Sequence, residues 1–321
     1  MKDAWGRTIE YVRLSLTDAC NFCCPYCRPA EITPQSQTQL LSVDEWMKIL
    51  GAFHHIGVKA VRLTGGEPLL YPHIEELLSR IKESGWFEDI SMTTNGSLLA
   101  SRAQRLKKFG LNRVNISLDS LETEAFAACV GKAGQLESVL DGIRSAINAN
   151  FKSVKINTVL SRYWSDDEVK SLLQYVEKWP VVWRFIEYMP FQGDAFHGPT
   201  FDEWKEQLER VSGGSLTEVH SVYGFGPATY LALPSGKAVG FIFSMSHSYC
   251  DTCNRVRLTS DGQMRLCLLR DDEADLVSLV RNGASEEALA THIERALQRK
   301  QERHDGIGME QPERPMWRIG G

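Results

Sequence analysis

The chain is 321 residues long, 43% of them hydrophobic, and its formal net charge is −5. This length and composition are typical of a globular protein with one large domain or two modest domains. The acidic balance argues against a nucleic-acid-binding surface, and because no run approaches roughly 18 apolar residues we expect no membrane partner. The N-terminus opens polar and lacks the apolar core of a signal peptide, which predicts a cytoplasmic location with reduced thiols.

Strands and helices are predicted to alternate along the first two-thirds of the chain. Two of the helices begin with a capping box, in which an N-cap Ser is followed three residues later by Glu. The predicted strands span 11–16, 60–64, 89–94, 113–118, 153–159 and 181–187. The predicted helices begin after Ser42, at Pro72, near 101, near 135 and after Ser165. Such a series favours a parallel sheet, either a partial barrel or an open doubly wound sheet.

The polarity of the strands chooses between these architectures. In the strands at 11–16, 60–64, 113–118 and 153–159, one face is apolar and the other is polar. A complete barrel would fill its interior with branched apolar residues, and an open sheet would be apolar on both faces. We therefore expect an incomplete (β/α)6 TIM-type barrel with helices outside and a polar ligand inside.

The last third of the chain changes character and is predicted to form a smaller α+β domain that covers the barrel opening. Its predicted helices span 201–211 and 285–303, and its predicted strands span 228–233, 238–244, 255–259 and 263–268. The last two strands form a hairpin that turns at Asp261-Gly262. We place the domains at 1–200 and 201–321.

Cys20, Cys24 and Cys27 form a C-x3-C-x2-C motif directly after the first strand. Clustered thiols in a reducing compartment favour metal binding over disulfides. A structural zinc site usually combines two separated pairs, and a ferredoxin cluster requires a fourth cysteine at a definite spacing. The motif therefore favours a three-thiolate iron–sulfur cluster with one open iron, although Cys23 permits a second count of the ligands.

A second triplet, Cys250, Cys253 and Cys267, flanks the predicted hairpin, so the strand ends can bring the three thiols together. The C-x2-C pair is a common half of a zinc site, and His247 is a possible fourth ligand. The spacing alone leaves zinc and a second open-site cluster equally supported.

The first triplet and a glycine turn together resemble the radical S-adenosylmethionine (SAM) enzymes. Their cysteine spacing is the same, with an aromatic residue before the third cysteine, a place that Tyr26 takes here. Gly65-Gly66-Glu67-Pro68 by itself fits an ordinary strand–helix turn, but beside the triplet it resembles the segment that holds the amino group of SAM. The resemblance implies a [4Fe-4S] cluster that binds and cleaves SAM.

The second triplet resembles the C-terminal cluster segment of one radical SAM family, the GTP 3′,8-cyclases of molybdenum cofactor biosynthesis. The similarity covers nearly the whole chain and ends at the double glycine Gly320-Gly321. Further matching segments are Arg13-Leu14-Ser15-Leu16-Thr17-Asp18, Val61-Arg62-Leu63-Thr64, Val114-Asn115-Ile116-Ser117-Leu118-Asp119-Ser120, Val154-Lys155-Ile156-Asn157-Thr158-Val159 and Arg184-Phe185-Ile186-Glu187. The resemblance implies a second [4Fe-4S] cluster, GTP as substrate, and a C-terminal tail that reaches the active site.

The resemblance also assigns site residues. Those that would contact SAM are Tyr26, Gly66, Ser117 and Met189. Those that would contact GTP are Arg13, Arg62, Thr93, Lys155, Arg255, Val256 and Arg257, with Arg184 a further candidate. The cations of the first, second and fifth strands fall on the polar strand face, where Arg forks and Lys charges suit a triphosphate. Cys23 and Arg28 depart from the residue types expected at their positions.

The resemblance further implies an electron donor, a downstream enzyme of the molybdopterin pathway, and a monomer or homodimer. Two other functions stay open at this point. One is a radical SAM enzyme that modifies peptides, although such enzymes usually carry more C-terminal cysteines. The other is a non-enzymatic iron–sulfur or zinc sensor, which would not need the glycine turn or the cations inside the barrel.

Overall fold

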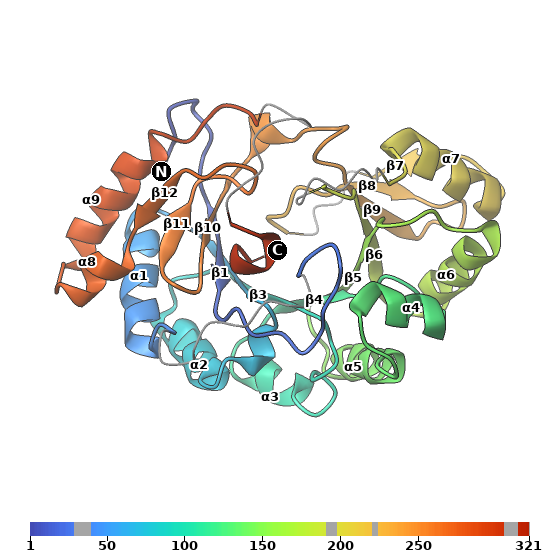
Figure 1. The fold of residues 1–321 in the computed structure, drawn as a ribbon, viewed down its shortest axis with the longest axis horizontal. Coiled ribbons are helices and arrows are strands. Elements are labelled where there is room, and N and C mark those ends of the chain that lie inside the picture. Colours follow the sequence, from blue (N-terminus) through green and yellow to red (C-terminus); the bar gives the residue numbers. More distant parts are fainter. Residues whose placement is uncertain (29–39, 191–197, 220–223, 305–313, 321) are drawn as a thin grey trace.

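The computed structural model describes residues 1–28, 40–190, 198–219, 224–304 and 314–320. Its strands form one sheet in the order β12-β11-β10-β1-β2-β3-β4-β5-β6-β9-β8-β7. Figure 1 shows the strands along an arc, with α1, α2, α3 and α5 on the outer side and the C-terminus on the inner side. The fold is an α/β partial barrel with helices outside, as predicted.

The central strands run parallel to one another in chain order. They are β1 (Tyr11–Ser15), β2 (Ala60–Thr64), β3 (Asp89–Thr94), β4 (Arg113–Ser117), β5 (Ser153–Val159) and β6 (Val182–Ile186). Each agrees with a predicted strand to within one residue at either end. Because parallel strands leave their carboxyl ends at one edge of the sheet, the motifs that follow these strands meet there.

Helices connect the central strands on the outer face. They are α1 (Val43–His55), α2 (Ile74–Ser84), α3 (Ala103–Lys108), α4 (Thr123–Val130), α5 (Leu136–Asn148) and α6 (Asp166–Lys178). The capping boxes at Ser42 and Ser165 are both formed. Two expectations are corrected, because α2 begins after His73 rather than at Pro72, and α4 was not predicted.

The C-terminal third adds strands to both edges of the same sheet. Its elements are α7 (Phe201–Ser212), β7 (Thr217–Glu218), β8 (Thr229–Ala232), β9 (Ala238–Ile242), β10 (Arg255–Leu258), β11 (Gln263–Arg265), β12 (Glu273–Asp275), α8 (Val277–Arg281) and α9 (Glu286–Leu297). The pairing of β9 with β6 and of β10 with β1 is parallel, whereas β10 and β11 form the predicted antiparallel hairpin. The helix α9 ends well before residue 303, where the prediction placed its end.

In β1, β2, β4 and β5 one face is apolar and the other is polar, as predicted. On the helix side, Leu14, Leu63 and Ile156 are fully buried, and each such side chain contributes about 1.5–3 kcal/mol of transfer free energy. On the inner side, Lys155 and Arg184 are buried as well. In the part of the chain that the structure describes, no helix is long and apolar enough to cross a membrane.

Candidate active site

A cavity opens on the inner side of the barrel, at the carboxyl ends of its strands. Residues from both halves of the chain line it. They include the first cysteine triplet, the predicted SAM contacts Tyr26, Gly66, Ser117 and Met189, and the predicted GTP contacts Arg13, Arg62, Thr93, Arg255 and Arg257. Arg184 lines it as well. The structure therefore brings most of the predicted site residues into one space.

The thiols of Cys20, Cys24 and Cys27 face this cavity and form no disulfide. Burial raises the pKa of Cys24 well above its ordinary value, and neighbouring Cys27 raises it further. Burial and the nearby Cys20 raise the pKa of Cys27 to about 12. Three thiols in one pocket suit a cluster that binds them as thiolates, because a positively charged metal centre offsets the cost of their ionisation.

Cys23 makes a different set of contacts from these three thiols. Its backbone N–H donates to the carbonyl of Val130 at 2.9 Å, and its Sγ donates to the carbonyl of Arg28 at 3.6 Å. Cys23 is absent from the described cavity lining, whereas Cys24 is part of it. The geometry thus favours the ligand count that uses Cys24.

The glycine turn after β2 packs directly against the chain that leads into the first triplet. The N–H of Gly66 donates to the carbonyl of Thr17 at 2.6 Å. A Cβ at Gly66 would lie 2.3 Å from the carbonyl oxygen of Ala19, closer than any side chain permits. Glycine is therefore required here for the close approach of two backbones.

Glu67, the residue after this turn, was not among the predicted site residues. Its buried carboxylate accepts hydrogen bonds from Thr94 Oγ1 at 2.7 Å, the N–H of Asn95 at 2.7 Å and the N–H of Leu69 at 3.0 Å. Burial raises its pKa to about 7 despite these bonds. Asn95 in turn points its amide nitrogen at Cys20 Sγ, 3.9 Å away. Glu67 thus ties the ends of β2 and β3 to the first triplet.

Tyr26 and Asp119 form a second support for the triplet. The phenol of Tyr26 donates to Asp119 Oδ2 at 2.7 Å, and the N–H of Val159 donates to Asp119 Oδ1 at 2.8 Å. Burial raises the pKa of Asp119 to about 6. Because Tyr26 lies between the second and third cysteines, this bond fixes the cysteine loop to the end of β5.

Arginines on three neighbouring strands occupy one row of the inner face. In the registers of β10, β1 and β2, Arg13 pairs with Arg257 on one side and with Arg62 on the other. Burial lowers the pKa of Arg13 well below its ordinary value, and the positive charge of Arg257 lowers it further. Such a row of like charges requires anionic or dipolar partners.

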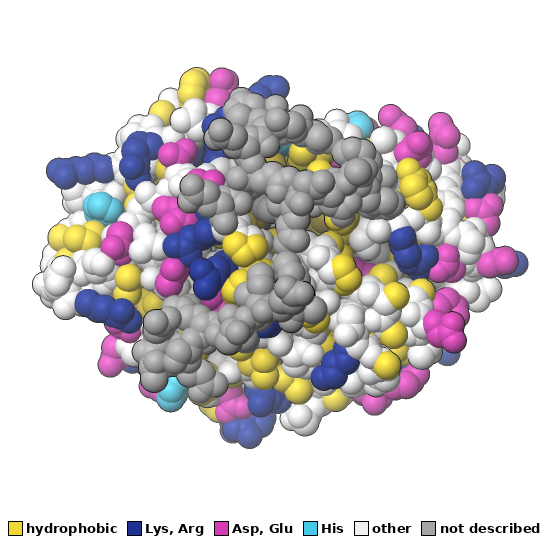
Figure 2. Space-filling model, viewed as in Figure 1, with side chains coloured by type: hydrophobic (Ala, Val, Ile, Leu, Met, Phe, Trp, Pro, Cys, Tyr) yellow, Lys and Arg dark blue, Asp and Glu magenta, His cyan; other side chains and the backbone are white. Residues whose placement is uncertain are grey.

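The carbonyl of Gly320 supplies one such partner. It accepts a hydrogen bond from Arg257 Nη1 at 2.7 Å and another from Arg13 Nη2 at 3.1 Å. The tail therefore reaches the cavity, as the resemblance implied, although Gly321 lies outside the described residues. On the face seen in Figure 2, by contrast, the cations of the periphery are interspersed with Asp and Glu.

Two predicted GTP contacts lie elsewhere. Lys155 is buried on the inner face but is not among the described lining residues, and burial next to Arg184 lowers its pKa to about 6. Val256 lines a second, smaller cavity. Arg184, in contrast, lines the main cavity and donates to Asn157 Oδ1 and Asn115 Oδ1 at 2.6 and 2.8 Å. This pairing shows that Arg184 of β6 faces the inside of the barrel, an orientation that the sequence alone did not predict.

The second cavity holds the second triplet. Cys250, Cys253 and Cys267 line it together with Lys300 and His304. Burial would raise the pKa of Cys250, but hydrogen bonds to His304 and Ser248 outweigh it and lower the pKa to about 6. Burial is likewise outweighed at Cys253, where the charges of Lys300 and Arg255 lower the pKa.

Lys300 and His304 were not predicted, because nothing in their local sequence signals a ligand site more than 30 residues away. Met189, Arg255 and Arg257 line both cavities. The two triplets therefore open on adjoining spaces that share cationic walls. Among the described residues, no three His, Cys, Asp or Glu side chains are arranged to hold a single metal ion. The fit of clusters therefore depends on the thiols and on the cavities that they line.

Comparisons with known proteins agree with this geometry. A family model described as the radical SAM superfamily matches residues 14–176. A second, described as Molybdenum Cofactor Synthesis C, matches residues 181–306. The two matched regions carry the first and the second triplet, respectively.

Relatives and structural neighbours extend the comparison. A GTP 3′,8-cyclase of Pelotomaculum thermopropionicum is 38% identical over 100% of both chains. One of Heliobacterium modesticaldum is 39% identical over 100% of both chains. Among solved structures, Streptococcus suis SuiB bound to S-adenosylmethionine covers 88% of this chain and 68% of its own, with a TM-score of 0.64 and 15% identity. At that identity the likeness concerns the fold alone.

Proposed function

This chain belongs to the radical SAM superfamily and to the family of the GTP 3′,8-cyclases, and we propose that it converts GTP to (8S)-3′,8-cyclo-7,8-dihydroguanosine 5′-triphosphate. That reaction is the first step of molybdenum cofactor biosynthesis. The observation that carries the proposal is the single cavity that joins the first triplet to the arginine row of β10, β1 and β2.

Two [4Fe-4S] clusters fit the donor sets. Cys20, Cys24 and Cys27 would hold the first, and the triplet at 250, 253 and 267 would hold the second. When bound, the first cluster would supply the electron for reductive cleavage of SAM, and the second would offer a further point of contact for GTP. Tyr26, Gly66, Ser117 and Met189 would form the SAM seat.

The protein's own residues bind and orient the substrate. Ring closure joins C3′ of the ribose to C8 of the guanine, so both atoms must be held close together and near SAM. Arg13, Arg62, Arg255 and Arg257 present guanidinium forks to the triphosphate, with Thr93, Lys155 and Val256 as further contacts. The hydrogen lost from C3′ is balanced by an electron and a proton delivered to the guanine, so the product is an isomer of GTP.

The proposal includes partners and a location. Each turnover needs one electron to cleave SAM and one to complete the product, so an electron donor must dock. A downstream enzyme of the molybdopterin pathway takes the product, and the protein acts as a monomer or homodimer. Its eight cysteines are all free, which supports a reducing, cytoplasmic location. The domains divide at residue 200, with the GTP contacts of β10 in the second domain.

The alternatives are less well supported. The barrel fold, which this chain shares with SuiB, would also suit a peptide-modifying enzyme. The relatives that match over their full length, however, are cyclases. A sensor or scaffold would not need a cavity that joins a SAM seat to a row of arginines.

Anaerobic reconstitution tests the proposal. We expect about eight irons per chain, GTP-dependent 5′-deoxyadenosine, and a cyclised nucleotide of the mass of GTP. The variant Cys129→Ala, which changes a buried cysteine outside both triplets, is the matched control and should keep the iron content. Four irons with one zinc, or 5′-deoxyadenosine that forms equally without GTP, would contradict the cyclase.

A further inference from the structure

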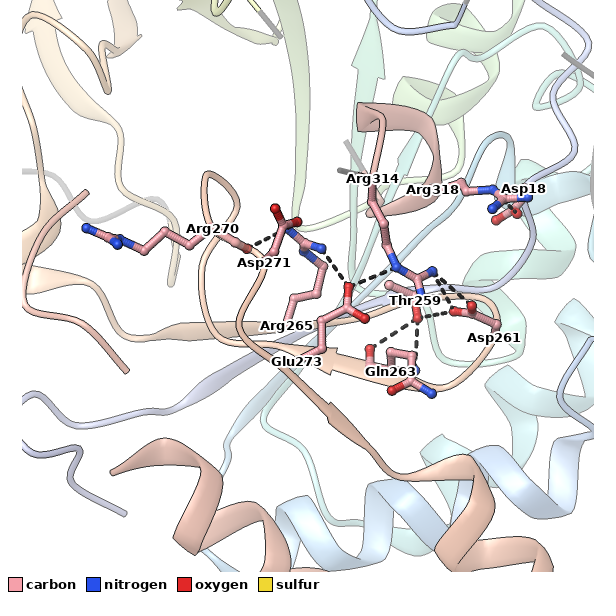
Figure 3. A network of polar contacts seen from close by, with 10 residues as sticks. All are labelled: Asp18, Thr259, Asp261, Gln263, Arg265, Arg270, Asp271, Glu273, Arg314 and Arg318. Carbon is pink, nitrogen blue, oxygen red and sulfur yellow. Dashed lines mark hydrogen bonds and ion pairs between the residues drawn. The ribbon is translucent and has the colours of Figure 1, made fainter. Parts of the chain in front are cut away.

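The C-terminal segment Arg314–Gly320 is anchored at its start by two carboxylates. Arg314 Nη1 lies 2.8 Å from Asp261 Oδ2, and Arg314 Nε lies 2.9 Å from Glu273 Oε1. Figure 3 shows Arg314 reaching between these two side chains, which come from the β10–β11 turn and from β12. A guanidinium that uses separate N–H groups on two carboxylates is fixed in direction as well as in place.

Glu273 is also bonded to the arginine that closes the loop carrying the third cysteine of the second triplet. Glu273 Oε1 also accepts from Arg265 Nη1 at 2.6 Å. Arg265 is fully buried, and it donates to the carbonyl of Arg270 and to Asp271 Oδ1 at 3.0 Å. These contacts close the loop 266–271, which contains Cys267. The anchor of the tail is therefore built into the structure around the second triplet (Figure 3).

Between anchor and cavity the segment is packed inward. Trp317 and Ile319 are buried at 2% and 1% exposure. Gly320 has φ +69°, and a Cβ there would lie 2.6 Å from Thr64 Oγ1. The segment thus runs from a fixed arginine to a position that has no room for a side chain and therefore requires glycine.

The end of the segment meets the arginine row. Arg13 and Arg257 carry like charges on adjacent strands, and the carbonyl of Gly320 lies between them as a shared acceptor. A shared acceptor holds two guanidiniums in one orientation against their mutual repulsion. Each guanidinium has five N–H donors, so the carbonyl leaves donors for phosphate oxygens.

We propose that Arg314 is a positioning residue for substrate binding, which holds the tail so that the carbonyl of Gly320 aligns Arg13 and Arg257 for the nucleotide. Arg314 does not touch the substrate and acts through the segment that follows it. The inference rests on the proposed function for the identity of the nucleotide, GTP. The anchoring of the tail by Arg314 does not depend on the proposed function.

Hydrogen exchange tests the anchoring in the full chain, anaerobically reconstituted and without nucleotide. In Arg314→Ala, the amides of residues 314–320 should exchange at least tenfold faster, and those of β2 to β4 should not change. Arg281→Ala is the matched control, because Arg281 also pairs with a carboxylate of another element, Glu45 Oε1 at 2.7 Å, but on the surface. Unchanged exchange at 314–320 in Arg314→Ala would overturn the proposal.

GTP affinity tests the consequence for the substrate. We expect Arg314→Ala to raise the Kd for GTP about tenfold, the scale of one lost hydrogen bond to a charged group. The rate at saturating GTP should stay within about twofold. The Kd of Arg314→Lys for GTP should lie between those of the wild type and of Arg314→Ala, because an ammonium keeps the charge but lacks the fork that spans two carboxylates.

The outcomes separate the two claims. Faster exchange with unchanged GTP affinity overturns the proposal, because the tail would then not align the arginines. Equal losses of affinity and of saturating rate overturn it too, since they indicate general disruption. A wild-type chain that binds no GTP overturns the proposed function and the substrate part of this inference, while the exchange experiment still decides whether Arg314 anchors the tail.

Discussion

The two cysteine triplets lie in opposite electrostatic surroundings. Around the first, burial, neighbouring thiols and Asp119 all raise the pKa of Cys24. Around the second, His304 and Lys300 lower the pKa values of Cys250 and Cys253 in spite of burial. In the metal-free chain, Cys24 and Cys27 therefore hold their protons, whereas Cys250 and Cys253 lose theirs more easily.

This difference indicates that the two triplets have separate roles in the site. The first triplet is enclosed by Glu67, Asp119 and the glycine turn, which hold a loop in place without adding positive charge. One cation is shared between the second triplet and the main cavity, because Arg255 lowers the pKa of Cys253 and also lines both cavities. Its charge thus stabilises a thiolate on one side and would bind phosphate on the other.

Substitution of the first triplet should give the largest effect. Cys24→Ala is expected to reduce SAM cleavage by about 1,000-fold or more, because three thiolates are the minimum for an open-site cluster. Cys23→Ala is the matched control, since its Sγ points to the carbonyl of Arg28 and not into the cavity. The measurement is 5′-deoxyadenosine formed after anaerobic reconstitution. The reverse result would mean that Cys23 is the middle ligand.

The second triplet should respond differently. Cys253→Ala is expected to keep the first cluster, and with it some SAM cleavage, but to lose the cyclised nucleotide. If Cys253→Ala and Cys24→Ala instead abolish SAM cleavage equally, the two triplets do not have the separate roles assigned to them.

Thiol labelling of the metal-free chain should give the next largest effect. With a pKa of about 6, Cys250 is mostly thiolate at pH 7, whereas Cys27, with a pKa of about 12, stays protonated. After allowance for the lower nucleophilicity of the more acidic thiol, Cys250 should react about 100-fold faster with iodoacetamide. Both residues are partly exposed, so neither is closed to the reagent.

The pH dependence checks the cause. Labelling of Cys250 should rise from pH 5 and level off above about pH 7, while labelling of Cys27 should rise tenfold per pH unit well beyond that. His304→Ala should move the Cys250 plateau to higher pH. Equal rates and parallel pH profiles for the two cysteines would contradict the difference in surroundings.

The sequence predicted the local parts of this comparison well and the long-range parts poorly. The central strands, the capping boxes at Ser42 and Ser165 and the hairpin depend on patterns of a few residues and were predicted, whereas β7, β12 and the capping box at Thr200 were not. The helix α4 was missed because it has only eight residues and buries only Phe126, Cys129 and Val130, a stripe too short to show a helical period. Lys300 and His304 approach the second triplet only in the folded chain. The pairing of β10 with β1 likewise joins segments that are far apart in the sequence. Contacts between residues so far apart in the chain leave no periodic pattern in the sequence.

Removal of one arginine from the shared wall should have an intermediate effect. Arg257→Ala is expected to weaken GTP binding about 10- to 100-fold, the cost of losing a charge-assisted contact. Binding of SAM should change by less than about threefold, because most of its predicted contacts belong to other segments, namely the cysteine loop (Tyr26) and the ends of β2 and β4 (Gly66 and Ser117). Isothermal titration with each ligand measures both. Arg144→Ala is the control, since Arg144 forms exposed pairs with Glu137 and Asp141 of α5. Equal losses for both ligands would contradict a separate nucleotide wall.

The smallest effect is expected at the support of the first triplet. Tyr26→Phe removes the hydrogen bond to Asp119 Oδ2 and should lower the unfolding free energy of the metal-free chain by about 1 kcal/mol at pH 8. Denaturant unfolding of wild type and variant at several pH values measures this difference.

The sign of its pH dependence follows from Asp119. Burial raises the folded-state pKa of Asp119 to about 6, above an unfolded value near 3.8, so the stability associated with its protonated form is complete below about pH 4 and is lost as the pH rises through 6. The phenol of Tyr26 favours the ionised form and limits that loss. Without the phenol, the pKa of Asp119 rises further and the loss grows. The difference between wild type and Tyr26→Phe should therefore be smallest near pH 4 and largest at pH 8. A difference that is constant over this range would mean that the phenol of Tyr26 supports the cysteine loop equally beside the neutral and the ionised carboxyl, and not through the charge of Asp119.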